Sequence, residues 1–201
     1  MARFARSPTS LGDLILIERQ SIADERGFFS RLFCMQELPG FGERISQINH
    51  TMTKVKGAVR GMHFQRSPDD ETKFVSCLRG AIFDVAVDLR PGSSTYLRWH
   101  GEILSEDNRR SLLIPAGFAH GFQTLTEDCE LIYLHDKPHA PSAEDGLNPL
   151  DPKLAIEWPL PITQMSDRDR NRAALDARER RASDPTILEF RYLHRSCRGG
   201  C

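Results

Sequence analysis

The segment IFDVAVD, residues Ile82–Asp88, alternates between two kinds of side chain in the way that a β-strand requires. One predicted face carries Phe83, Val85 and Val87, and the other carries Asp84, Ala86 and Asp88. Turn signals bound the segment, with Arg79-Gly80 before it and Pro91-Gly92 after it. We therefore interpret it as one strand in a series of short strands joined by tight turns.

Similar short apolar runs continue in both directions along the chain, at intervals of roughly ten residues. They are Leu14–Ile17, Ala58–Phe64, Phe74–Leu78, Leu112–Ile114 and Leu131–Leu134. No long helical period separates these runs. The sequence therefore predicts an all-β sandwich or barrel.

The C-terminal part of the chain has a different composition. Ser166–Arg181 is rich in Asp, Arg and Ala, and Ser166 has an acidic residue three positions later, Asp169, as in a weak capping box. We expect one barrel domain over residues 1–165, with residues 166–201 forming a small helical tail that packs on the barrel. The last residues, Arg195–Cys201, are expected to be frayed.

Charge and composition exclude several classes of protein. The 201 residues include 27 basic and 28 acidic side chains, a net charge of −1, whereas broad nucleic-acid binding needs a basic surface. No run reaches the roughly 18 apolar residues that would indicate a membrane span, and Met1–Leu11 lacks the apolar core of a signal peptide. The five cysteines are odd in number and lack zinc-site spacing. We expect free thiols in a reducing cytoplasm.

The first segment that places polar residues inside β-rich sequence is RGMHFQ, Arg60–Gln65, followed by Lys73. Strand alternation predicts that Arg60 shares a face with Met62, and that His63 shares the other face with Gln65. The glycine at position 61 indicates a bulge that could re-aim these side chains. An alternative for this segment alone is a surface strand with a solvated arginine and a lone histidine.

The second such segment is IPAGFAHGF, Ile114–Phe122, in which a Pro-x-Gly turn delivers His120 onto the next strand. This pattern resembles the second motif of the cupin superfamily of small jelly-roll barrels. Metal-binding cupins usually supply His-x-His and a glutamate in their first motif, but His63 is followed by Phe64-Gln65. Two separated histidines without a matched carboxylate are a poor site for a divalent metal. We therefore expect no metal and no cofactor.

Taken in order, these motifs resemble the dTDP-4-dehydrorhamnose 3,5-epimerase family of cupins from about Ile17 to Asp169. The matching motifs are Asp24–Phe29, Gln47–His50, Arg60–Gln65, Gly80–Asp88, Pro115–Phe122, Tyr133, Asp151-Pro152 and Ser166–Asp169. The resemblance implies a cupin-type jelly roll and a nucleoside-diphosphate 4-keto-6-deoxy sugar as substrate. The ketone at carbon 4 acidifies the protons at carbons 3 and 5, so inversion through an enolate needs a base, an acid on the opposite face and a nearby cation.

The resemblance also implies a role for individual residues. His63 corresponds to the base, Asp169 to the carboxylate paired with it, Tyr133 to the acid and Lys73 to the cation beside the carbon-4 oxygen. Substrate-binding positions are implied for Arg26, Gln47, Asn49, Arg60, His120 and Glu144. Each residue also has an ordinary structural explanation, such as an exposed strand lysine for Lys73, a helix cap for Asp169 or a barrel-rim aromatic for Tyr133.

Two positions depart from the family pattern, and we count both among the substrate-binding residues. His139 stands where members usually carry a second tyrosine beside the sugar ring, which raises the hypothesis that only one carbon is inverted. Arg31 stands where a glutamate usually lies near the nucleobase. Because a guanidinium only donates hydrogen bonds, Arg31 predicts a base other than thymine, such as cytosine, uracil or guanine.

The family resemblance implies a homodimer in which N-terminal strands are exchanged, so Asp24–Arg31 would serve the partner's site. Two other functions stay open at this point. One is a 4-keto-sugar ketoisomerase on a similar barrel, and the other is a non-catalytic sugar or nucleotide binder, which would need the pocket but not an acid and a base on opposite faces.

Overall fold

Strands account for nearly all of the regular structure in the computed structural model, which describes residues 3–38 and 40–175. In the first half of the chain they are β1 (Phe4–Pro8), β2 (Ile15–Arg19), β3 (Ser21–Asp24), β4 (Gly27–Ser30), β5 (Gln47–Thr53), β6 (Val59–Gln65) and β7 (Lys73–Arg79). In the second half they are β8 (Ala81–Asp88), β9 (Trp99–Ser105), β10 (Arg110–Ile114), β11 (Phe118–Thr124), β12 (Cys129–His135) and β13 (Glu144–Gly146). A single turn of helix, α1 (Asp167–Arg170), follows within the described residues.

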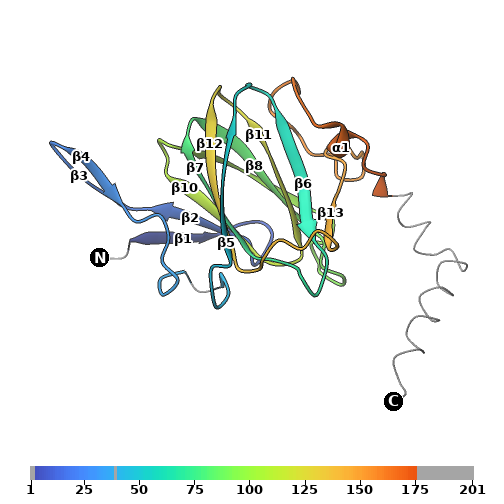
Figure 1. The fold of residues 1–201 in the computed structure, drawn as a ribbon, viewed down its shortest axis with the longest axis horizontal. Helices are drawn as coiled ribbons and strands as arrows, with labels where there is room; N and C mark the ends of the chain where they lie inside the picture. The colour runs from blue at the N-terminus through green and yellow to red at the C-terminus, as the bar shows by residue number, and fades with distance from the viewer. Residues whose placement is uncertain (1–2, 39, 176–201) are drawn as a thin grey trace, which may run out of the picture.

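The strands form two antiparallel sheets that face each other, and a separate hairpin (Figure 1). The six-stranded sheet has the order β1-β2-β10-β7-β12-β5, and the five-stranded sheet has the order β13-β6-β11-β8-β9. Figure 1 shows the β3–β4 hairpin extending away from the barrel. The prediction of an all-β, cupin-type barrel is confirmed, and each predicted apolar run overlaps a strand.

The alternation of β8 places its two faces in two different cores. Ile82 and Ala86 belong to the cluster between the sheets, together with Leu112 and Leu131. Val85 belongs to a second cluster on the outside of the five-stranded sheet, where the segment after β13 covers it. Both faces of this strand are therefore packed, so its aspartates need partners inside the protein.

Strand β6 corrects one prediction. On β11, one residue separates His120 from Phe122, but two residues of β6 separate their partners His63 and Arg60, so β6 contains a bulge. As a result Arg60 and His63 both face the space between the sheets, while Met62 is buried on the opposite side. The prediction that Arg60 shares a face with Met62 is wrong, because the bulge shifts the alternation by one residue.

The segment after residue 160 returns to β6 and ends in the short helix. The backbone N–H of Val59 donates to the Gln164 carbonyl at 2.8 Å, and the Ser166 hydroxyl accepts from the Asp169 N–H at 3.1 Å, which confirms Ser166 as the N-cap. Helix α1 ends at Arg170. The rest of the predicted tail, including its frayed end, lies outside the described residues.

Across residues 3–38 and 40–175, we find no helix with the length and apolar character needed to cross a membrane.

Candidate active site

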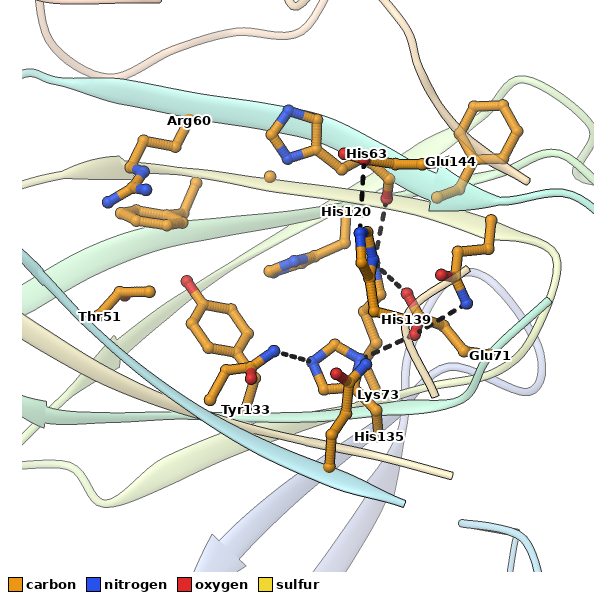
Figure 2. A pocket seen from close by; sticks show the side chains of 16 residues that line it. Thr51, Arg60, His63, Glu71, Lys73, His120, Tyr133, His135, His139 and Glu144 are labelled. Atoms are coloured by element: carbon orange, nitrogen blue, oxygen red, sulfur yellow. Dashed lines mark hydrogen bonds and ion pairs between the residues drawn. The ribbon is translucent and has the colours of Figure 1, made fainter. Parts of the chain in front are cut away.

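A cavity of about 470 Å³ opens between the two sheets (Figure 2). Strands from both sheets line it, because β5, β7 and β12 belong to one sheet and β6 and β11 to the other. The predicted site residues among its lining are Gln47, Asn49, Arg60, His63, Lys73, His120, Tyr133, His139 and Glu144. The fold therefore brings together side chains that are far apart in the sequence.

His63 on β6 is paired with a carboxylate of the C-terminal segment. Its Nε2 lies 2.7 Å from Oδ1 of Asp169, and the imidazole is partly exposed to the cavity whereas the carboxylate is buried. Burial acts to raise the pKa of the Asp169 carboxyl. This effect of burial is outweighed by contacts with His63, the Ser166 hydroxyl and the Gly61 amide, so the pKa of Asp169 lies below its usual range. Asp169 therefore stays ionised and can hold the imidazole in one orientation.

Tyr133 on β12 lies on the other sheet from His63, and Figure 2 shows the two side chains on opposite sides of the cavity. Its ring makes an edge contact with His120, with 5.9 Å between ring centroids, and stacks on His135 at 6.3 Å. Burial raises the pKa of the Tyr133 phenol well above its ordinary value, although Thr51 and Arg60 act in the opposite direction. The phenol therefore carries its proton at neutral pH.

His120 on β11 forms a second histidine–carboxylate pair beneath the cavity. Its Nε2 lies 2.7 Å from Oδ1 of Asp84, and both side chains are buried. Asp84 was not among the predicted site residues, although its position on the polar face of β8 was evident in the sequence. The pair satisfies one of the carboxylate oxygens, and the other, Oδ2, has no hydrogen-bond partner among the described residues.

Lys73 on β7 lies within a buried polar network that includes two residues not anticipated from the sequence. Its Nζ donates to the His63 carbonyl at 3.1 Å and lies 3.3 Å from Oε1 of Glu71. The other oxygen of Glu71 lies 2.9 Å from Nδ1 of His135, and Nε2 of His135 lies 3.3 Å from the Asn49 amide nitrogen. For His135 the sequence signal is its spacing, because it follows Tyr133 by two positions on the same face of β12, whereas Glu71 lies before β7 and has no such signal.

The remaining predicted residues in the cavity extend from its centre to its edge. The Arg60 guanidinium donates to the Thr53 hydroxyl at 3.3 Å. His139 Nε2 lies 3.9 Å from one oxygen of Glu144, whose other oxygen pairs with Arg168 at 2.5 Å. The glutamate thus connects the loop that carries His139 to helix α1.

Two predicted residues, Arg26 and Arg31, do not line this cavity. Arg26 is in the turn of the β3–β4 hairpin and pairs with the exposed Asp24 at 2.6 Å. Arg31 follows the hairpin and pairs with Glu37. Within one chain, the fold therefore does not bring either arginine to the other site residues.

The His, Asp and Glu side chains of the site are all residue types that can bind a metal. Over residues 3–38 and 40–175, no cluster of three or more His, Cys, Asp or Glu side chains has the arrangement of a metal site. Cys34, Cys77 and Cys129 are free, and burial raises the pKa of the Cys77 thiol to about 12.

Comparison with known proteins assigns this arrangement to a family. The family model described as dTDP-4-dehydrorhamnose 3,5-epimerase matches residues 8–177. The chain belongs to this family. A dTDP-4-dehydrorhamnose 3,5-epimerase from Methanothermobacter thermautotrophicus is 42% identical to it over 176 residues, which cover 85% of this chain and 94% of that protein.

Solved structures of epimerases have the same fold. A dTDP-4-dehydrorhamnose 3,5-epimerase from Bacillus anthracis, solved with TDP and PPi bound, is 38% identical and superimposes with a TM-score of 0.81, covering 86% of this chain and 99% of that one. A 3'-monoepimerase from Streptomyces bikiniensis, in complex with dTDP-quinovose, is 33% identical with a TM-score of 0.80, covering 94% and 96%. Membership of the epimerase family confirms the prediction of an isomerase of deoxysugar biosynthesis, and it favours an epimerase over the ketoisomerase and the non-catalytic binder.

Proposed function

We propose that this protein epimerises a nucleoside-diphosphate 4-keto-6-deoxy sugar, with His63 as the base and Tyr133 as the acid. The observation that carries this proposal is the position of these two side chains on facing sheets of one cavity. Inversion of a carbon centre requires that a proton leave one face and another arrive on the opposite face. An imidazole and a neutral phenol separated in this way match that requirement.

The reaction needs no change in oxidation state. His63 takes the proton from the carbon beside the ketone, and the electron pair of the broken C–H bond moves onto the carbon-4 oxygen as an enolate. Lys73 stabilises this oxygen, and Tyr133 gives its proton to the opposite face as the carbonyl re-forms. The imidazolium then loses its proton to solvent, and the phenolate takes one up. Asp169 stabilises the imidazolium meanwhile, as a carboxylate does in other histidine–aspartate pairs.

The nucleotide end of the substrate would extend along the β5 side of the same cavity. Gln47 and Asn49 point from β5, and Arg60 supplies the positive charge there for a diphosphate. Arg26 and Arg31 would reach the site only from a second chain, so we propose a cytoplasmic homodimer in which the β3–β4 hairpin of one subunit contacts the partner. The exposed Phe28 and Phe29 on this hairpin support such a contact.

Proton exchange in deuterated water tests both the reaction and the number of centres inverted. NMR measures deuterium uptake into a dTDP-4-keto-6-deoxy sugar. We expect the wild-type protein to introduce deuterium at the inverted carbon, and we expect His63→Ala to slow this exchange by roughly 10²–10⁴-fold. The His139 hypothesis predicts exchange with inversion at only one of carbons 3 and 5, and equal inversion at both would refute it. A wild-type protein that binds the sugar but exchanges no proton would contradict the epimerase proposal itself.

Arg31 leads to a separate proposal about the nucleobase. If it contacts the base from a partner subunit, a base other than thymine is preferred, because a guanidinium cannot accept from the N3–H of thymine as a glutamate can. Comparison of the binding of thymidine, cytidine, uridine and guanosine diphosphates checks this proposal. A clear preference for the thymidine nucleotide would refute it and would agree with the ligands of the related structures.

A further inference from the structure

Lys73, the proposed cation of the reaction, is not an isolated charge. The side chains of Glu71, Lys73 and His135 are all more than nine-tenths buried, and they form one connected group at the base of the cavity (Figure 2). A buried ammonium without a partner would be strongly unfavourable, so a counter-ion is expected. The identity and position of this counter-ion determine where the Lys73 ammonium lies.

The hydrogen-bonding capacity of Lys73 limits what it can offer a substrate. An ammonium has three N–H donors. Among the described residues, one donor is directed to the His63 carbonyl at 3.1 Å and one to Glu71 at 3.3 Å. One N–H remains for a ligand in the cavity, and the other two contacts fix its direction.

Glu71 is held in turn from its other side. Its second carboxylate oxygen lies 2.9 Å from Nδ1 of His135 and 3.4 Å from the Gln65 amide nitrogen. Because a carboxylate only accepts, Nδ1 of His135 carries a proton, and Nε2 faces the Asn49 amide nitrogen at 3.3 Å. Both oxygens of Glu71 are therefore occupied by fixed donors.

Direct proton transfer by Glu71 does not fit this arrangement. Burial acts to raise the pKa of its carboxyl, but the hydrogen bond from His135 and the charge of Lys73 outweigh burial and keep this pKa below its usual range. Glu71 is thus an ionised acceptor, and each of its oxygens already has a donor within the protein. Any effect on the reaction has to pass through the groups that it holds.

We propose that Glu71, braced by His135, is a positioning residue that acts through Lys73, aiming the one unused N–H of its ammonium at the substrate oxygen that becomes negative during the reaction. This inference rests on the proposed epimerase function. The interaction with that oxygen strengthens as charge develops, so misdirection of Lys73 lowers kcat more than it raises KM. The negative charge of Glu71 also lowers the net positive charge near the oxyanion, so holding the lysine in place weakens its electrostatic effect.

A double-mutant cycle between positions 71 and 73 tests the proposal. Glu71→Gln keeps the size of the side chain but removes its charge, and we expect it to lower kcat by roughly 10- to 100-fold with little change in KM. In a Lys73→Met background the same substitution should cause no further loss, because its effect passes through the lysine. Equal losses in both backgrounds, or no loss in the wild-type background, would overturn the proposal.

Two further comparisons separate positioning from folding. Asp88→Asn removes another buried carboxylate, one paired with Arg90 outside the cavity, and should lower stability without lowering kcat per folded molecule. If Glu71→Gln does not fold, His135→Leu can be compared with His135→Asn, which retains a nitrogen near the Nδ1 position. Greater kcat for His135→Asn supports the bracing role, and equal kcat for the two variants contradicts it. Absence of exchange in the wild-type protein would instead contradict the proposed function.

Discussion

The contact between His63 and Asp169 links the stability of the fold to pH. The pKa of the Asp169 carboxyl is lower in the folded protein than its usual value, about 3.9 in unfolded chains. Such a group stabilises the fold above the unfolded-state pKa, and this contribution is lost as the pH falls through the folded-state pKa. We therefore expect the stability advantage of the wild type over Asp169→Asn to shrink as the pH falls below this unfolded-state value.

Urea unfolding at a series of pH values measures this difference. Asp167→Asn is the matched control, because Asp167 is an exposed carboxylate in the same helical turn. Its stability should follow that of the wild type across the acid range. A wild-type advantage over Asp169→Asn that grows on acidification would show that the carboxyl is not stabilised in its charged form.

Single residues of the site were predictable where a polar side chain interrupts apolar sequence within a recognised motif. His63 was named in this way, and Lys73 and Asp169 were named from the family resemblance. The fold places all three together, although their roles stay predictions. Glu71 and His135 were not named, because they belong to no motif and become important only through contacts across two strands. Such pairs can be identified from the sequence only if the register between strands is already known.

At the level of elements, the bulge in β6 determines how Arg60 and His63 face the cavity. Gly61 has a φ of +136°, and a Cβ at this position would lie 2.4 Å from the Gly121 Cα on β11. Gly61→Ala is expected to cost about 2–4 kcal/mol of stability and to displace His63, because backbone cannot move aside easily. Circular dichroism during thermal unfolding and the exchange rate per folded molecule check both effects.

Gly92→Ala provides the control for this substitution. Gly92 also has a positive φ, +79°, but a Cβ there would meet no atom within 4 Å. We expect Gly92→Ala to lower the free energy of unfolding by about 1 kcal/mol because of the backbone conformation alone. The rate of proton exchange into the sugar should be unchanged. Similar losses of stability and activity in the two variants would contradict the importance of close packing between β6 and β11.

The strands were predictable from alternation because successive side chains enter different environments, as in β8, whose two faces belong to two different clusters. Alternation failed at β6, where the bulge moves Arg60 onto the face of His63. Alternation also could not predict the length of helix α1. The carbonyl of its last residue accepts a hydrogen bond from the Asn148 amide, and the backbone N–H of Leu175 then donates to Asp151. Tertiary hydrogen bonds of this kind have no local signal in sequence.

At the level of the whole molecule, the β3–β4 hairpin presents apolar surface outside the barrel. Ile22, Phe28 and Phe29 are 57%, 61% and 58% exposed, and Arg109 lies over the ring of Phe28 at 4.5 Å. Phe28→Ser together with Phe29→Ser is expected to convert the proposed dimer to monomers, because burial of these rings would supply much of the contact. Size-exclusion chromatography with light scattering measures the mass, and a monomeric wild type would contradict the proposal.

A mixture of two inactive variants tests whether sites are shared between subunits. His63→Ala and Arg26→Ala homodimers should each be impaired, whereas mixed dimers contain one site with both residues intact. We expect activity to reappear after the subunits are unfolded together and refolded. If the mixture stays as inactive as its parents, the hairpin does not serve the partner's site.

The central claim is that His63 and Tyr133 act on opposite faces of one bound keto-sugar. Its most direct test is Tyr133→Phe in deuterated water, with NMR used to follow deuterium uptake and configuration at the same carbon. The account predicts that this variant still takes up deuterium through His63 but returns it to the original face, so that exchange continues while inversion is lost. Inversion at the wild-type rate in Tyr133→Phe would contradict the account.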